Sequence, residues 1–405
     1  MSISLLYHTQ RVEGYEHVCY EFVEGEVSQY IKRKKQKHVC SACNSQNITA
    51  TELSGFRKIK ALNMGLKNFN IMVKPYRNRC HDCNAFQMEQ IGFTSSKYAR
   101  ISKALERSIS NLVRYMSIKA VAAYFGLDWG TVKDVYKKQL KKKYAHIPLR
   151  DVRIIGVDEV HMGGKTFLTI VRDLESGAVL FVGKGKGSYA LEKFNKKLRR
   201  SKAKIKFIAM DMANSYSSWA KLQLPKATIV YDHFHVIKLM NDKLNSVRRR
   251  MMSQLDANDK FALKGMRFHL LKNQENLSDK ASQQLNNCLD LYEEINKAHY
   301  LKEMLRGIYQ NLSVIDDVES ALEYWHELAI NSGVPEMKTM ARTIKSRYSG
   351  ILAYWQTGKC ISSAAMEGFN NKIGWATRQA YGYRDMEFLE LIIYDLPDTK
   401  TAKEL

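Results

Sequence analysis

The sequence lacks any apolar run long enough to cross a bilayer, and its N-terminus lacks a signal-peptide pattern. We therefore expect a cytoplasmic protein without a membrane partner. Negative charge is also scarce, because 41 Asp and Glu stand against 64 Lys and Arg, a formal charge of +23. Such an excess favours nucleic acid as the partner. A basic chain kept soluble by its charge, or one that binds acidic membranes, has the same composition.

Cysteine is sparse, and its count of seven is odd, which argues against a disulfide framework. Four cysteines form two CxxC pairs, Cys40 with Cys43 and Cys80 with Cys83. Each pair can present two thiolates to one zinc ion, so together they predict one structural Zn²⁺ in a zinc-ribbon-like domain over residues 38–92. Buried or redox-active cysteines are the alternative.

A helix-turn-helix is predicted within a DNA-binding domain at residues 93–148. Gly126 can end the first helix, and Asp128 stands where the N-cap of the second belongs. The basic tail KKQLKKKY favours DNA binding, although an ordinary helical hairpin has the same pattern. The expected contacts come from the second helix, with the first three at base edges and the last two at phosphates: Trp129, Thr131, Lys133, Lys137 and Lys138.

After residue 148 the sequence predicts the order β-β-β-α-β-α-β-α, which is the order of the ribonuclease H fold. Three apolar runs there end in an acid, at Asp158, Asp211 and Asp232. A single acid of this kind can simply cap the next helix. Asp158 and Asp211, however, fall on strands that this order makes neighbours, so we expect them to share a divalent cation. Glu159 is predicted to point to the opposite face of its strand.

Helical periodicity then continues over residues 253–356 and predicts an all-α insertion that leaves the sheet and returns to it. The expected fold is therefore multidomain α/β, with a ribonuclease H-like mixed sheet interrupted by this insertion. The catalytic domain would comprise residues 149–252 and 357–405. A basic segment over residues 1–37, the zinc ribbon and the helix-turn-helix would precede it.

A polar stripe is predicted on a helix near the C-terminus. Apolar residues recur there at steps of three and four, and the opposite side carries Glu367, Asn370, Asn371 and Arg378. Such a stripe suits a helix laid between a metal and DNA, although a solvated helix face has the same pattern. We expect both asparagines and the arginine to contact DNA.

Several motifs resemble the ISL-three family of insertion-sequence transposases, over nearly the whole chain. They are GVDEVH, AMDMANSY, YDHFHVIKLMND and MEGFNNK followed by AYGYRD. The resemblance implies a DDE triad of Asp158, Asp211 and Glu367. It also matches Asp232 and His235 to an Asp-x-x-His element of related transposases, which adds them to the expected catalytic residues. His235 would orient a water or a phosphate, or else be a helix-start histidine satisfied by Asp232.

The resemblance implies a transposase that binds the terminal inverted repeats of an insertion sequence, cleaves the DNA ends and joins the 3′-hydroxyls to target DNA. Two Mg²⁺ or Mn²⁺ ions per active site would serve this transesterification. The implied partners are double-stranded DNA, as transposon ends and target, and further copies of the chain in a homodimer or larger assembly. The alternatives are a DNA-binding regulator on an inactive core and a structure-specific nuclease without strand transfer.

Overall fold

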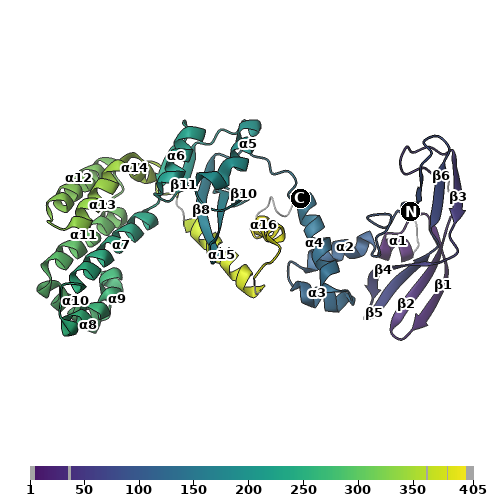
Figure 1. Cartoon of the computed structure of the whole chain (residues 1–405), viewed down its shortest axis with the longest axis horizontal. Coiled ribbons are helices and arrows are strands. Elements are labelled where there is room, and N and C mark those ends of the chain that lie inside the picture. The colour runs from purple at the N-terminus through teal and green to yellow at the C-terminus, as the bar shows by residue number, and fades with distance from the viewer. Residues whose placement is uncertain (1–4, 35–37, 362–363, 381, 398–405) are drawn as a thin grey trace. The chain divides into compact units, whose positions relative to one another are not determined.

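The computed structural model describes residues 5–34, 38–361, 364–380 and 382–397, and the chain divides into two compact units, Met1–Ala145 and His146–Leu405 (Figure 1). The first unit contains a four-stranded sheet in the order β1-β2-β5-β4. Its strands are β1 (Tyr15–Val23), β2 (Glu26–Arg33), β5 (Lys67–Val73) and β4 (Arg57–Met64), and helix α1 (Leu5–Gln10) precedes them. Strands from the segment expected as separate, residues 1–37, thus pair with strands of the zinc-ribbon-like region.

A second, three-stranded sheet of this unit presents the paired cysteines. Its order is β3-β6-β7, with β3 (Ile48–Glu52), β6 (Tyr76–Cys80) and β7 (Phe86–Met88). The predicted helix-turn-helix follows as α3 (Ile118–Phe125) and α4 (Trp129–Lys143), after helix α2 (Lys103–Leu112). Apolar side chains of all three helices, among them Leu105, Val121 and Val132, form one small core.

The second unit is built on a five-stranded sheet in the order β10-β9-β8-β11-β12. The strands are β8 (Ile154–Gly163), β9 (Thr166–Asp173), β10 (Val179–Lys184), β11 (Phe207–Met210) and β12 (Thr228–Tyr231). The 3-10 turn η1 (Ser188–Leu191) and helix α5 (Glu192–Ser201) follow β10, α6 (Asn214–Gln223) follows β11, and α7 (His233–Met252) follows β12. The predicted order of strands and helices is therefore confirmed.

Helices cover both faces of this sheet because its side chains alternate between two apolar clusters. Ile155 and Val157 of β8 lie in the cluster that contains Phe194 of α5 and Trp219 of α6. On the opposite face, Val160, Leu168 and Ile170 pack with side chains of α15 (Ala364–Gln379) and α16 (Met386–Asp395). The sheet therefore lies between two layers of helices.

Residues 253–356 are mainly helical, as predicted for the insertion. Its helices are α8 (Ala257–Gly265), α9 (Arg267–Leu271), α10 (Asp279–Leu291), α11 (Glu293–Asn311), α12 (Ile315–Asn331), α13 (Pro335–Ser346) and α14 (Tyr348–Gln356), with a 3-10 turn, η2 (Gln274–Asn276), before α10.

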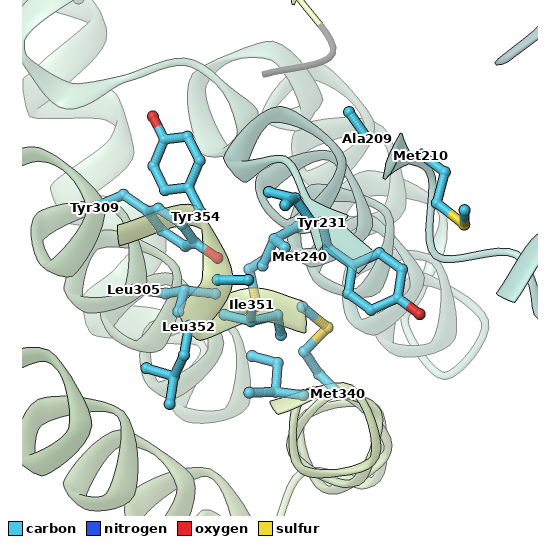
Figure 2. Close-up of a cluster of buried hydrophobic side chains, with 14 of the residues drawn as sticks. Ala209, Met210, Tyr231, Met240, Leu305, Tyr309, Met340, Ile351, Leu352 and Tyr354 are labelled. Carbon is cyan, nitrogen blue, oxygen red and sulfur yellow. The ribbon is translucent and has the colours of Figure 1, made fainter. Parts of the chain in front are cut away.

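The core of these helices is continuous with the core on one face of the sheet. Figure 2 shows Leu305 of α11 and Ile351 of α14 in the same cluster as Tyr231, at the end of β12. Gly350 permits this close approach, since a Cβ there would lie 2.6 Å from the Tyr231 ring. The insertion is thus packed firmly on the β12 side of the sheet.

Candidate catalytic site and cysteine cluster

Asp158 and Asp211 lie side by side at the point where the pairing of β8 with β11 ends. Strands β8 and β11 pair in parallel with Val157 opposite Met210, so the two aspartates that follow are neighbours across the pair. Oδ1 of Asp211 accepts the backbone N–H of Ala213 at 2.9 Å, which closes a tight turn into α6. The order of strands thus brings together two acids that are 53 positions apart, as predicted.

Four neighbouring groups shift the pKa of Asp158 and therefore lie close to its carboxylate. Burial raises the pKa of Asp158, and the charge of Asp211 raises it further. The backbone N–H of Glu159, the charge of His235 and the amide of Asn370 lower it. His235 and Asn370 belong to α7 and α15, so two helices distant in sequence converge on the carboxylate.

Helix α15 is docked closely on β8 and β9. Met366 packs where Gly156 has no side chain, since a Cβ at Gly156 would lie 2.8 Å from Cγ of Met366. Arg172 of β9 is buried, donates from Nη1 to the carbonyl oxygen of Ala365 at 2.7 Å, and stacks over the Phe369 ring with its Cζ 4.1 Å from the centroid. These contacts hold the first turns of α15 against the strand that carries Asp158.

Glu367 lies in the first turn of α15 and is exposed. Asn370 follows it by three positions, so both lie on the same side of the helix. Asn370 donates from Nδ2 to Oδ2 of Asp158 at 2.7 Å. The side of α15 that carries Glu367 is therefore the side that faces the aspartates.

Within the described residues, the acids named above do not form a group of three ligands all within 4.8 Å of one another; the four cysteines do. Carboxylates that hold two ions about 3.5–4 Å apart need not meet that limit, since the outer ligands lie on either side of the ion pair. Among the described residues, Asp158 and Asp211 lie side by side, whereas Glu367 is exposed in the first turn of α15.

Asp232 and His235 occupy different surroundings. Asp232 is fully buried and pairs with Nδ1 of His233 at 2.9 Å. The His233 ring lies 5.9 Å from that of Tyr309 and 5.6 Å from that of Tyr354, between centroids. Asp232 thus faces the junction with the insertion, whereas His235 lies within electrostatic range of Asp158.

Arg347, at the start of α14, is a residue that the sequence analysis missed. Its guanidinium donates to the carbonyl oxygen of Met212 at 2.8 Å and to Oδ1 of Asn214 at 2.6 Å. The insertion therefore holds the loop that follows Asp211. No sequence pattern signals this contact, because 135 positions separate Arg347 from Met212.

Glu159 points away from the two aspartates, as predicted. Its Oε1 accepts the hydroxyl hydrogen of Tyr216 at 2.7 Å and the backbone N–H of Gly187 at 3.2 Å. Burial raises the pKa of Tyr216, so its phenol remains a donor. Glu159 thus holds α6 and the turn after β10 by hydrogen bonds on the face of the sheet opposite to Asp158.

The four cysteines of the first unit converge as predicted. Sγ of Cys40 lies 3.7 Å from that of Cys83, and Sγ of Cys43 lies 3.6 Å from that of Cys80. A tetrahedral zinc ion with Zn–S bonds of about 2.3 Å has sulfur–sulfur edges of about 3.8 Å. Backbone N–H groups of Cys43 and Ala42 lower the pKa of Cys40 to about 6, which favours the thiolate. The cluster therefore fits a four-sulfur metal site.

The helix-turn-helix has the capping that the sequence predicts. Gly126 has a left-handed φ of 58° at the end of α3, and Asp128 accepts the backbone N–H of Thr131 at 2.8 Å at the start of α4. The Thr131 hydroxyl also donates to Asp128, at 2.5 Å, so this side chain takes part in the cap.

Other side chains expected at DNA lie mostly at the surface. Trp129 is 53% exposed and Lys133 lies over its ring, with Nζ 5.7 Å from the centroid. Lys137 is half-buried and Lys138 is exposed, with Nζ 3.1 Å from the Ser95 hydroxyl. On α15, both Asn371 and Arg378 are exposed, whereas Asn370 is half-buried.

Among the helices that the structure describes, none combines the length and apolarity needed to span a membrane.

Comparisons with known proteins identify related sequences. Residues 155–393, more than half of the chain, match a family described as Transposase, and residues 96–139 match the helix-turn-helix domain of transposase family ISL3. The transposase for insertion sequence element IS1001 of Bordetella parapertussis is 28% identical over 378 residues, which cover 91% of this chain and 90% of that relative.

Two further proteins are more distant. The transposase for insertion sequence element IS1557 of Mycobacterium tuberculosis (strain ATCC 25618 / H37Rv) is 25% identical over 312 residues, covering 71% of this chain and 69% of the relative. A solved Drosophila P element transposase strand transfer complex is 11% identical, with a TM-score of 0.41 and coverage of 74% of this chain and 92% of that one. The family matches show that this chain belongs to the ISL3 family of transposases.

Proposed function

We propose that the chain is a DDE transposase that binds the terminal inverted repeats of an insertion sequence, cleaves the DNA ends and joins their 3′-hydroxyls to target DNA. The observation that carries this proposal is the convergence of Asp158, Asp211, His235 and Asn370 from four separate places in the chain, which are β8, the end of β11, α7 and α15. The proposal includes a ribonuclease H-like catalytic fold. The sheet order β10-β9-β8-β11-β12, with β8 parallel to β11, supports it.

Oxygen ligands of this kind suit Mg²⁺ or Mn²⁺. Asp158, Asp211 and Glu367 would hold two such ions. Bound ions neutralise charge on the attacking and leaving oxygens of a phosphodiester. Asn370 and the Glu159 N–H group orient the Asp158 carboxylate, and His235 orients a water or a DNA phosphate beside it.

Double-stranded DNA is the proposed partner of both units. Helix α4 would enter the major groove, with Trp129 and Lys133 near bases and Lys137 and Lys138 near phosphates. Asn371 and Arg378 would meet DNA beside the catalytic acids. One structural Zn²⁺ would occupy the cysteine cluster, and at least two copies of the chain would pair two transposon ends in the cytoplasm.

Cleavage of labelled element ends tests this function directly. Asp158→Asn, Asp211→Asn and Glu367→Gln should each lower Mg²⁺- or Mn²⁺-dependent cleavage by at least about 100-fold, because loss of a metal ligand costs at least as much as loss of a group that supports one. End binding should persist. Asp151→Asn, which changes an exposed acid of the same unit, serves as the control. Wild-type cleavage in all three variants, with binding intact, would contradict the proposal.

Strand transfer separates this function from its alternatives. A transposase should join the labelled ends to a target plasmid, whereas a structure-specific nuclease should only cut. A DNA-binding regulator on an inactive core should bind the ends without cutting in either metal.

A further inference from the structure

Asn370 has an unusual position for a residue expected at DNA. Its Nδ2 lies 2.7 Å from Oδ2 of Asp158, across 212 positions of sequence. An ionised carboxylate can only accept hydrogen bonds, so the amide must present its nitrogen to Asp158. This requirement fixes the orientation of the amide and turns Oδ1 away from that carboxylate oxygen.

The amide oxygen of Asn370 accepts no hydrogen bond from the part of the chain that the structure describes. Oδ1 is buried, and no described residue donates a hydrogen bond to it. Buried acceptors are paired in nearly all proteins, and an exception commonly marks a site for an ion or water. Since Oδ1 and Nδ2 of a planar amide are about 2.3 Å apart, Oδ1 lies within about 5 Å of Oδ2 of Asp158. The unpaired oxygen is therefore close enough to that carboxylate for both to contact one cation.

We propose that Asn370 is a further metal-site residue, in which Nδ2 positions Asp158 and Oδ1 is an additional oxygen ligand of the cation. This inference rests on the proposed two-metal function. Amide oxygens are suitable ligands for hard divalent cations. The docking of α15 by Gly156 and Arg172 holds the amide at this place.

The role of Asn370 thus differs from that of its neighbour. Asn371 is exposed on the same helix, whereas the Asn370 amide bonds to an acid of the site. Asn371 therefore provides a matched control, because it shares the residue type, the helix and the adjacent position but not the contact with Asp158.

Titration of the zinc-loaded full chain with Mn²⁺, followed by electron paramagnetic resonance of the free ion, tests the proposal without DNA. Asn370→Ala should weaken Mn²⁺ binding by about 10- to 100-fold, whereas Asn371→Ala should leave it unchanged. Equal affinity of Asn370→Ala and the wild-type chain would overturn the inference.

Asn370→Asp provides a second, nearly isosteric variant. It keeps an oxygen at this position but sets a second carboxylate against Asp158, so the melting temperature should fall without metal and rise more on Mn²⁺ addition than in the wild-type chain. A residue that only supports the helix would show no larger rise, and that result would overturn the ligand role. Asp158→Asn separates the two proposals: unchanged Mn²⁺ affinity in that variant would contradict the metal site as a whole, whatever Asn370 does.

Discussion

His299 of α11 is buried among charged side chains. Its residue is 5% exposed, and this burial lowers its pKa to about 4. The charges of Lys302 and Arg306 lower the pKa further, whereas that of Glu303 opposes them. Lys302 is itself buried and donates to the carbonyl oxygen of Leu270 at 3.0 Å. The folded insertion therefore favours the neutral form of His299.

We predict that acid destabilises the insertion through His299. The pKa of His299 is 6.5 in the unfolded chain and about 4 in the folded one. Between these two pH values His299 binds more protons in the unfolded chain than in the folded chain, so the free energy of unfolding falls as pH decreases. The loss from pH 7.5 to 4.5 should be about 1–3 kcal/mol. Hydrogen exchange of α11 amides at several pH values measures it. His299→Gln should flatten this dependence, and an unchanged slope in that variant would contradict the assignment.

The neighbours of each aspartate determine whether it can serve in a metal site or only bonds to its own turn. The sequence predicts some of these neighbours but not others. Asp158 and Asp211 were predictable as neighbours because local patterns give the order of strands and helices along the chain, and that order matches a known sheet arrangement. Asp173 ends β9 but accepts N–H groups of its own turn, from Glu175 at 3.1 Å. The burial of Asp232 was not predictable, because the rings around its partner His233 come from α11 and α14.

At the scale of elements, α15 packs closely on β8 because Gly156 has no side chain. We predict that Gly156→Ala costs about 1–3 kcal/mol, since the new methyl group would crowd Met366 and Leu174. Met366→Ala alone should cost about 2–5 kcal/mol by leaving a cavity. The double variant should lose less than the sum, because truncation of Met366 makes room for the methyl group.

Denaturant unfolding of the four proteins measures this coupling, and cleavage assays should follow the same order. Strict additivity of the two losses would show that α15 does not approach β8 at Gly156. The sequence predicts the apolar face of α15 from its period, but not which strand receives it, because period alone does not specify the partner.

At the scale of the whole molecule, the two units have separate cores. The apolar clusters of the first unit consist of residues from 6 to 135, and those of the second begin at Leu149. Local patterns predicted much of this organisation, because CxxC pairs, helix caps and strand periods act over a few residues. The pairing of β2 with β5 and the continuity of the insertion with the sheet depend on contacts far apart in sequence, which those patterns do not encode.

We predict that zinc removal affects the first unit alone. A chelator, or Cys80→Ser, should increase hydrogen exchange in β3, β6 and β7, because the proposed metal would join the turn before β3 to the turn between β6 and β7. Exchange in the sheet of the second unit should not change. Cys19→Ser, which alters an exposed free cysteine of the same unit, is the control. An equal increase of hydrogen exchange in both units would contradict their independence.

The contact of Arg347 with the loop after Asp211 connects the helical insertion directly to the turn that holds this proposed metal ligand. A displacement of α14 is transmitted through one rigid guanidinium to the turn that orients the carboxylate. If Asp211 holds a metal ion as proposed, binding of DNA or of a second copy by the insertion would therefore alter the position of this carboxylate.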